Sequence, residues 1–177
     1  MYLRVQDTWY FLVTVLDAYS RYVVHWDLLT TMTAAAVRVV IHDALKKTGA
    51  KPQVVTDNGS QFTAKDFKEL VRDFGLEHIR IRTYHPESNG RIERFHRSTR
   101  EALDDHELHN LGRAREIICR WVEFYNTRRL HAGLKYLAPT EYWKGDPQAR
   151  FKERNKKLEQ ARERRETINR KRIQEAA

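Results

Sequence analysis

The change of apolar periodicity along the chain constrains its fold more than any other feature of the sequence. Three β-prone segments come first, at residues 2–5, 9–16 and 22–29, and the short connections between them predict two successive antiparallel pairings. The second segment, WYFLVTVL, is apolar throughout, which predicts a strand covered on both faces. The chain is therefore expected to open with an antiparallel sheet.

Helical spacing of apolar residues follows the third strand. Thr33 and Gly49 are expected to bound a first helix, and Thr63 is expected to cap a second helix that Gly75 stops. The other expected elements are strands at residues 53–56 and 78–82 and helices at 89–106 and 114–125. This order predicts an α/β fold with a mixed five-stranded sheet, in which three antiparallel strands precede two parallel ones, flanked by helices.

Positive charge is concentrated at one end of the chain. The 33 Lys and Arg residues against 24 Asp and Glu give a net charge of +9, which favours a polyanionic partner. Residues 150–177 carry 11 basic and 5 acidic residues, and hence +6 of this charge. We expect a core over residues 1–143 and a basic helical tail over residues 144–177. The tail is either a solvated helical extension or an electrostatic arm for a phosphate backbone.

Several classes of protein are excluded by what the sequence lacks. No apolar run approaches the roughly 18 residues of a membrane-spanning helix, and the N-terminus does not have the pattern of a secretory signal. A single cysteine, Cys119, excludes an internal disulfide and a Cys-rich zinc site. Neither GxxxxGK nor GxGxxG occurs, so nucleotide hydrolysis is not indicated. A reducing, intracellular setting without a membrane fits best.

Asp57 is the first candidate for chemistry. It follows the fourth expected strand in the stretch TDNGSQF, and ends of strands followed by glycine turns are where α/β sheets present polar groups to ligands. The alternative is that Asp57 simply caps a turn, because Asp-Asn-Gly is a common turn sequence.

Glu93 is the second candidate, in the first turns of the helix expected over residues 89–106. Arg97 and Arg100 follow it at i+4 and i+7 and share its face. One interpretation is a solvated, salt-bridged face. The other is a carboxylate beside two cations, which suits the binding of a metal ion and of the phosphates it activates.

The two candidates belong to a longer pattern of motifs. Thirty-five residues separate Asp57 from Glu93. The chain resembles the catalytic core of retroviral-type integrases and related bacterial insertion-sequence transposases over about residues 1–143. The stretches that carry this resemblance are LDAYSR (16–21), TDNGSQF (56–62), HPESNGRIERF (85–95), WVEFYN (121–126), RRLH (128–131) and PTEYW (139–143).

The resemblance implies an RNase H-like fold with a DDE active site, in which two aspartates and a glutamate hold two Mg²⁺ or Mn²⁺ ions. Asp57 would be the second carboxylate and Glu93 the third. A metal pair can activate the attacking oxygen and stabilise the leaving oxygen of an in-line phosphodiester displacement. By analogy, water would first free a 3′-OH at the end of the element, and this hydroxyl would then attack target DNA.

The resemblance also implies partners and contacts. Transposon ends and target DNA would be the substrates of a homo-multimer, acting in the bacterial cytoplasm and associated with the nucleoid when bound to DNA. The candidate DNA contacts are basic or imidazole side chains of the Glu93 helix, the loop before it and the tail: Arg94, Arg97, Arg100, His85, Lys156 and Lys157.

The sequence departs from the family pattern at the first aspartate. The first strand opens as Met1-Tyr2-Leu3-Arg4, so we expect the missing aspartate just upstream of Met1 and interpret the chain as a fragment. Asp17 could substitute for it, since antiparallel pairing brings the end of the second strand near that position. The interpretation we favour is that Asp17 orders the Ser20-Arg21 turn.

Loss of one of three carboxylates predicts weak catalysis by this chain alone. The main hypothesis is DNA strand cleavage and strand transfer by a DDE integrase or transposase core. The alternative is a catalytically inactive DNA-binding transposase remnant. A third possibility, a nuclease of the same fold that cuts without joining, is disfavoured by the NGRIER and WVEFYN blocks.

Overall fold

The antiparallel sheet forms as predicted at the start of the chain. The computed structural model describes residues 1–49, 52–80 and 90–175. Strands β1 (Tyr2–Val5), β2 (Thr8–Leu16) and β3 (Val23–Leu29) pair antiparallel in the order β1-β2-β3. The expectation that β2 is covered on both faces is wrong at its start, where Trp9 is 58% exposed beside the β1–β2 turn.

The capping residues read from the sequence predict both ends of the first helix correctly but place the start of the second helix incorrectly. Helix α1 (Ala34–Thr48) begins after Thr33, whose hydroxyl accepts a hydrogen bond from the Ala36 N–H at 3.3 Å, and ends at Gly49 with φ of 63°. Thr63 does not cap the next long helix. It closes the short helix α2 (Ser60–Thr63), where its hydroxyl donates to the Ser60 carbonyl, and α3 (Lys65–Asp73) starts after Ala64.

The two parallel strands form a sheet of their own. Strand β4 (Gln53–Thr56) pairs parallel with β5 (Glu77–Arg80), so the predicted order of three antiparallel and two parallel strands is confirmed. The prediction that all five strands join in a single sheet is not confirmed. Among the described residues the strands are hydrogen-bonded as two sheets. Periodicity predicts a strand, and the length of its connection predicts its direction. The neighbour of each strand depends on long-range hydrogen bonds that no local pattern encodes.

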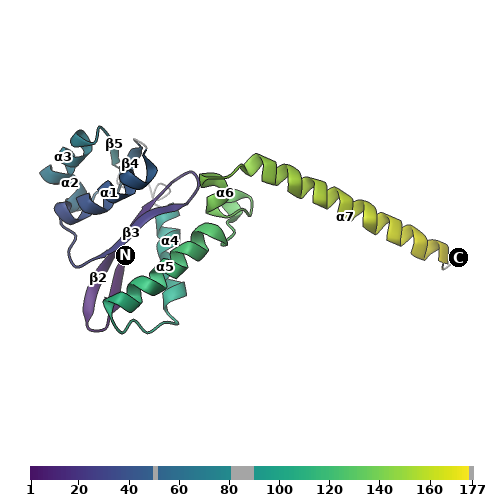
Figure 1. Cartoon of the computed structure of the whole chain (residues 1–177), viewed down its shortest axis with the longest axis horizontal. Helices are drawn as coiled ribbons and strands as arrows, with labels where there is room; N and C mark the ends of the chain where they lie inside the picture. The colour runs from purple at the N-terminus through teal and green to yellow at the C-terminus, as the bar shows by residue number, and fades with distance from the viewer. Residues whose placement is uncertain (50–51, 81–89, 176–177) are drawn as a thin grey trace.

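Two further helices cover the antiparallel sheet. Helix α4 (Gly90–Leu103) and α5 (Leu111–Thr127) lie beside β1–β3 (Figure 1). Helix α1 also packs against β2 and β3, and it contacts α2 and α3 as well. Apolar side chains of the sheet, α4 and α5 form one core, in which Leu12, Phe95 and Ile118 are almost fully buried. A second core joins α1 to α3.

A buried amide ties α5 to the sheet. Asn126, 5% exposed near the end of α5, accepts a hydrogen bond from the Val23 N–H at 2.8 Å and donates one to the Val23 carbonyl at 3.0 Å. Both backbone groups of the first residue of β3 are thereby satisfied away from water. This contact sets where α5 lies along β3.

The tail is one long helix that leaves the body of the protein (Figure 1). Helix α7 (Pro147–Glu175) follows the 3₁₀ turn Ala132–Leu134 and the short helix α6 (Pro139–Trp143), and confirms the predicted helical extension. Its first turns are held by the Arg150–Glu141 ion pair at 2.9 Å and by a hydrogen bond from Arg154 to the Lys135 carbonyl at 2.8 Å. Within the described ranges, no helix is both long and apolar enough to cross a bilayer.

Candidate active site

Asp57 stands at the carboxyl end of β4, as predicted, with its side chain exposed. Its Oδ1 accepts a hydrogen bond from the Gly59 N–H at 2.9 Å, so the turn-capping interaction is present. This bond engages one carboxylate oxygen and is compatible with a ligand bound through the other. The turn interpretation and the functional interpretation of Asp57 therefore do not exclude each other.

The backbone at Asp57 is held by a relay of two hydrogen bonds, which runs from His78 on β5 through the Thr56 hydroxyl to the Asp57 carbonyl. The buried Thr56 hydroxyl donates to the Asp57 carbonyl at 2.9 Å and lies 2.8 Å from His78 Nε2. Because the hydroxyl proton is used on Asp57, His78 must donate from Nε2. Burial, followed by the charge of Arg80, lowers the pKa of His78 and so favours this neutral donor. The relay fixes Asp57 relative to both parallel strands.

Glu93 lies in the first turn of α4 and is exposed. Among the described residues it makes no ion pair, and neither does Arg97, so the predicted alternative of a salt-bridged face is not formed there. A carboxylate in the first helical turn is favoured by the helix dipole. Glu93 is thus held in an exposed position with its charge uncompensated by any described cation.

The arginines of α4 do not share one face. Arg91, Arg94, Arg97 and Arg100 are spaced by three residues, and at about 100° per residue the first and last point to opposite sides of the helix. Arg94 lies close enough to Arg21 to lower its pKa. Arg100 lies close enough to the Met1 amino group for its charge to lower the pKa of that group. The predicted contacts Arg94, Arg97 and Arg100 therefore wind around the helix.

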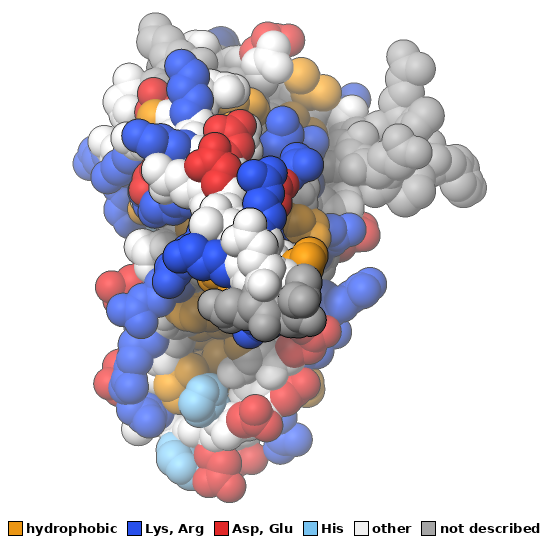
Figure 2. Space-filling model, turned by 90° about the vertical axis from the view of Figure 1, so that its right-hand side faces the viewer, with side chains coloured by type: hydrophobic (Ala, Val, Ile, Leu, Met, Phe, Trp, Pro, Cys, Tyr) orange, Lys and Arg blue, Asp and Glu red, His pale blue; other side chains and the backbone are white. Residues whose placement is uncertain are grey.

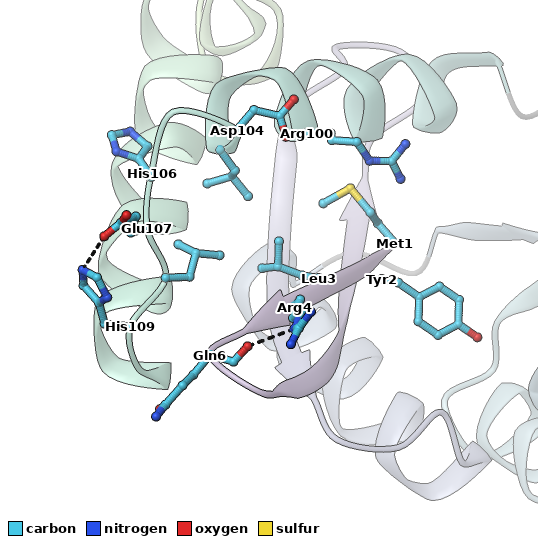
Figure 3. A pocket seen from close by; sticks show the side chains of 12 residues that line it. Met1, Tyr2, Leu3, Arg4, Gln6, Arg100, Asp104, His106, Glu107 and His109 are labelled. Carbon is cyan, nitrogen blue, oxygen red and sulfur yellow. Dashed lines mark hydrogen bonds and ion pairs between the residues drawn. The ribbon is translucent and has the colours of Figure 1, made fainter.

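A cavity of about 690 Å³ opens between β1 and the end of α4, lined in part by Met1, Arg4 and Arg100 (Figure 3). The Met1 amino group donates to the Leu12 carbonyl at 3.0 Å, and burial, followed by the charge of Arg100, lowers its pKa. The cavity lies on the Arg100 side of α4.

Asp17 is engaged in the turn between β2 and β3. Its Oδ2 accepts hydrogen bonds from the Ser20 N–H at 2.7 Å and from the Ser20 hydroxyl at 2.6 Å, and Ser20 is fully buried. Of the remaining candidates, Lys156 and Lys157 lie exposed on α7, with Lys157 paired to Glu153 at 2.7 Å. His85 falls outside the described residues.

The donor set suits a hard cation only in part. Carboxylate oxygens are the ligands that Mg²⁺ prefers, and it is often held by one or two carboxylates together with substrate phosphates and water. Asp57 and Glu93 supply that chemistry. Over residues 1–49, 52–80 and 90–175, no group of three Asp, Glu, His or Cys side chains comes close enough together to hold a metal ion.

Comparison with known families decides the classification. Two family signatures, each described as an integrase core domain, match residues 1–86 and 74–139. The chain belongs to the integrase core family. The two matches together cover both candidate carboxylates.

Individual sequences similar to this integrase core come from bacterial insertion sequences. The transposase for insertion sequence element IS904 of Lactococcus lactis is 29% identical over 147 residues, which cover 81% of this chain and 58% of the relative. The chain spans about half the length of the curated relatives it matches.

Two solved structures show the same fold at low sequence identity. The HTLV-2 integrase catalytic core domain matches 74% of this chain and covers 83% of its own, with a TM-score of 0.61 and 19% identity. The catalytic domain of Mos1 mariner transposase matches 70% of this chain and 66% of its own, with a TM-score of 0.58 and 14% identity. The predicted RNase H-like α/β fold is thus confirmed.

The stability of the integrase core is expected to fall as the pH drops from about 6.5 to about 4. Burial, followed by the Met1 amino group and Arg100, lowers the pKa of His96 from 6.5 to about 4, and its Nε2 is buried without a partner among the described residues. The unfolded chain therefore binds a proton in this range that the folded chain does not, which favours unfolding. Urea denaturation at a series of pH values measures the effect.

The matched variants for this prediction are His96→Gln and His106→Gln, since His106 is exposed. We expect the first to make the pH dependence of the free energy of unfolding less steep without removing it, because burial also lowers the pKa of His131 to about 4. The second should leave it unchanged. An equally steep dependence in His96→Gln would contradict the assignment.

Proposed function

We propose that this integrase core cleaves and transfers DNA strands with the help of a divalent metal ion, and that Asp57 and Glu93 are its metal ligands. The observation that carries the proposal is the exposure of both carboxylates, neither in an ion pair with a described residue, at the end of β4 and the start of α4. In this proposal they are the second and third carboxylates of the family motif.

Mg²⁺ or Mn²⁺ is the cofactor that this donor set favours. The HTLV-2 relative was solved in complex with magnesium. When bound, such an ion would polarise a phosphodiester and activate an attacking oxygen. The contribution of the chain is to orient the ligands: the Gly59 N–H and the Thr56 relay hold Asp57, and the first turn of α4 holds Glu93. A two-metal site needs further oxygen ligands, which a DNA phosphate and an upstream aspartate would supply.

DNA is the substrate that the charge distribution favours. We propose Arg94, Arg97 and Arg100 on α4 and His85 before it as backbone contacts, with transposon ends and target DNA bound by a homo-multimer. Bacterial relatives support a site of action on nucleoid DNA in the cytoplasm. Seen from the C-terminal end of α7, the surface carries many Lys and Arg side chains with Asp and Glu between them (Figure 2).

The tail is expected to contribute salt-dependent affinity for DNA. Replacing Lys156 and Lys157 by Gln should weaken binding of a labelled duplex about threefold to tenfold at low salt, and should reduce the slope of log K against log salt by about 1 to 2. Anisotropy titrations over a range of salt concentrations measure both quantities.

A matched control replaces Lys65 and Lys68, two exposed lysines of α3, by Gln. If the tail variant and this control lose the same affinity, α7 is only a solvated extension.

A catalytically inactive DNA-binding remnant is the second candidate function. The absence of a three-ligand group among the described residues favours it. It predicts DNA binding in EDTA and no nicking with Mg²⁺ or Mn²⁺, even when the chain is extended in frame upstream of Met1. Metal-dependent joining by the extended form would exclude it.

A further inference from the structure

The turn between β2 and β3 meets the segment after α5 through one arginine. Arg21 has a left-handed backbone, with φ of 61°, and its N–H donates to the Asp17 carbonyl at 2.8 Å. Its guanidinium lies directly against Gly133, where an added Cβ would come within 2.0 Å of Arg21 Nη2. The half-buried Arg21 side chain thus packs against a glycine that lies 112 positions further along the chain.

A second arginine is fixed nearby, between α4 and α5. Arg129 Nη2 donates to the Ser98 hydroxyl at 3.0 Å, and its guanidinium lies over the Trp121 ring, 5.7 Å from the ring centre. Stacking on an aromatic ring and one neutral hydrogen bond orient the guanidinium without neutralising it. Four further N–H donors of a guanidinium remain for other acceptors.

Two arginines of α4 share the helix face that meets these residues: Arg91 and Arg94 lie one turn before Phe95 and Ser98, whose side chains contact Tyr125 and Arg129. Burial lowers the pKa of Arg21, and the charges of Arg94 and Arg91 lower it further, against an opposite effect of Tyr125. His131, only 7% exposed and packed edge-on against Tyr125, has its pKa lowered to about 4 by burial, then by Arg21, Arg129 and Arg94. Several cations thus surround one neutral imidazole.

We name this set the arginine cluster: Arg21, Arg91, Arg94 and Arg129. In the described part of the chain no carboxylate forms an ion pair with any of the four. His131 Nε2, buried at the same place, has no hydrogen-bond partner there either. Repulsion among four arginines that no carboxylate neutralises destabilises the protein without ligand. Such unfavourable arrangements are found mostly at functional sites, where a ligand offsets them.

We propose that the arginine cluster binds phosphate oxygens of a DNA strand at the first turns of α4. Guanidinium groups match the geometry of phosphate, and a bound anion would relieve their repulsion. Arg94 follows Glu93 by one residue and points about 100° away from it around α4, so a strand held by the cluster crosses the first turns of this helix on a neighbouring face. The inference rests on the proposed function, because it takes DNA as the substrate, and it adds the site at which the backbone is held.

The experiment compares Arg91→Gln/Arg94→Gln with Arg72→Gln/Lys68→Gln, which removes the same charge from exposed positions on α3. Gln preserves helix propensity. Anisotropy with a labelled 20-base strand in EDTA should show affinity about tenfold weaker for the cluster variant, and a salt slope lower by about 2, while the control changes little.

Two further measurements test where the phosphate site lies and whether it can be correct when the proposed DNA function is not. Gly133→Ala keeps every charge but displaces the Arg21 guanidinium, and should weaken strand binding about threefold. Inorganic pyrophosphate should raise the melting temperature of the unaltered chain and of the control, but not that of the cluster variant.

If the cluster variant and the control behave alike toward both the strand and pyrophosphate, the inferred site is wrong while the proposed function stands on its other residues. If the unaltered chain ignores the strand but gains stability from pyrophosphate through the cluster, the phosphate site is correct and the DNA function fails. If the chain binds neither probe, the inference is overturned.

Discussion

Asp57→Asn and Glu93→Gln are each expected to abolish DNA nicking and joining by the integrase core. A metal-bound carboxylate supports several kcal/mol of transition-state stabilisation, and each 1.36 kcal/mol changes a rate about tenfold, so we expect losses of at least about a thousandfold. Both substitutions keep the size of the side chain and remove the charge that binds the ion. Product formation from end-labelled DNA with Mg²⁺ or Mn²⁺ measures the loss.

Matched controls are Asp66→Asn in the first turn of α3 and Glu101→Gln on α4, two exposed carboxylates outside the proposed site. They should retain activity within about twofold, as is usual for surface substitutions. Comparable activity of Asp57→Asn and the Asp66 control would remove Asp57 from the site.

The assay should be run on residues 1–177 and on a form extended in frame upstream. Met1 and Leu12 already exchange two backbone hydrogen bonds, of 2.8 and 3.0 Å, so added residues would continue β1 opposite Val13 and Thr14. We expect only the extended form to be strongly active. Robust joining by residues 1–177 would contradict the need for an upstream aspartate. If Asp17→Asn then abolished this joining activity, Asp17 would be identified as the substitute for the first aspartate.

Local signals in the sequence predicted most of the elements. Thr33 and Gly49 bound α1 because a hydroxyl cap and a left-handed glycine act within one helical turn. The expectation for Thr63 was wrong because residues Ser60–Thr63 form a short helix of their own, in which the Thr63 hydroxyl bonds to the Ser60 carbonyl. Such competition between neighbouring local hydrogen bonds is decided by packing, and α3 packs from Phe67 onwards.

The candidate carboxylates were also predictable, since Asp57 follows a strand and Glu93 opens a helix. The arginine cluster was not. Arg21 meets Gly133 across 112 positions and Arg129 meets Ser98 across 31, and neither pair leaves a periodic trace in the sequence. The sequence shows that Arg21 and Arg129 both lie in motifs shared with the family. Such motifs indicate that a residue matters, but they do not show that two residues are close in space.

Asn126→Ala is expected to destabilise the fold more than any surface substitution. It leaves the N–H and the carbonyl of Val23 buried without partners, and each unsatisfied group costs about 1–3 kcal/mol. We expect a loss of about 3 kcal/mol in the free energy of unfolding, which corresponds to about 6–12 °C in melting temperature for a chain of this size. Urea and thermal denaturation measure both values.

The neighbouring Thr127→Ala serves as the control, because the exposed Thr127 hydroxyl bonds to the Glu123 carbonyl of its own helix and to no other residue that the structure describes. Its effect should stay below about 0.5 kcal/mol. Val23 begins β3 two residues after Arg21, so release of this strand end should also loosen the arginine cluster. Asn126→Ala is therefore expected to lose pyrophosphate stabilisation at temperatures where it is still folded. A stability loss equal to that of Thr127→Ala would show that the amide does not anchor α5 to the sheet.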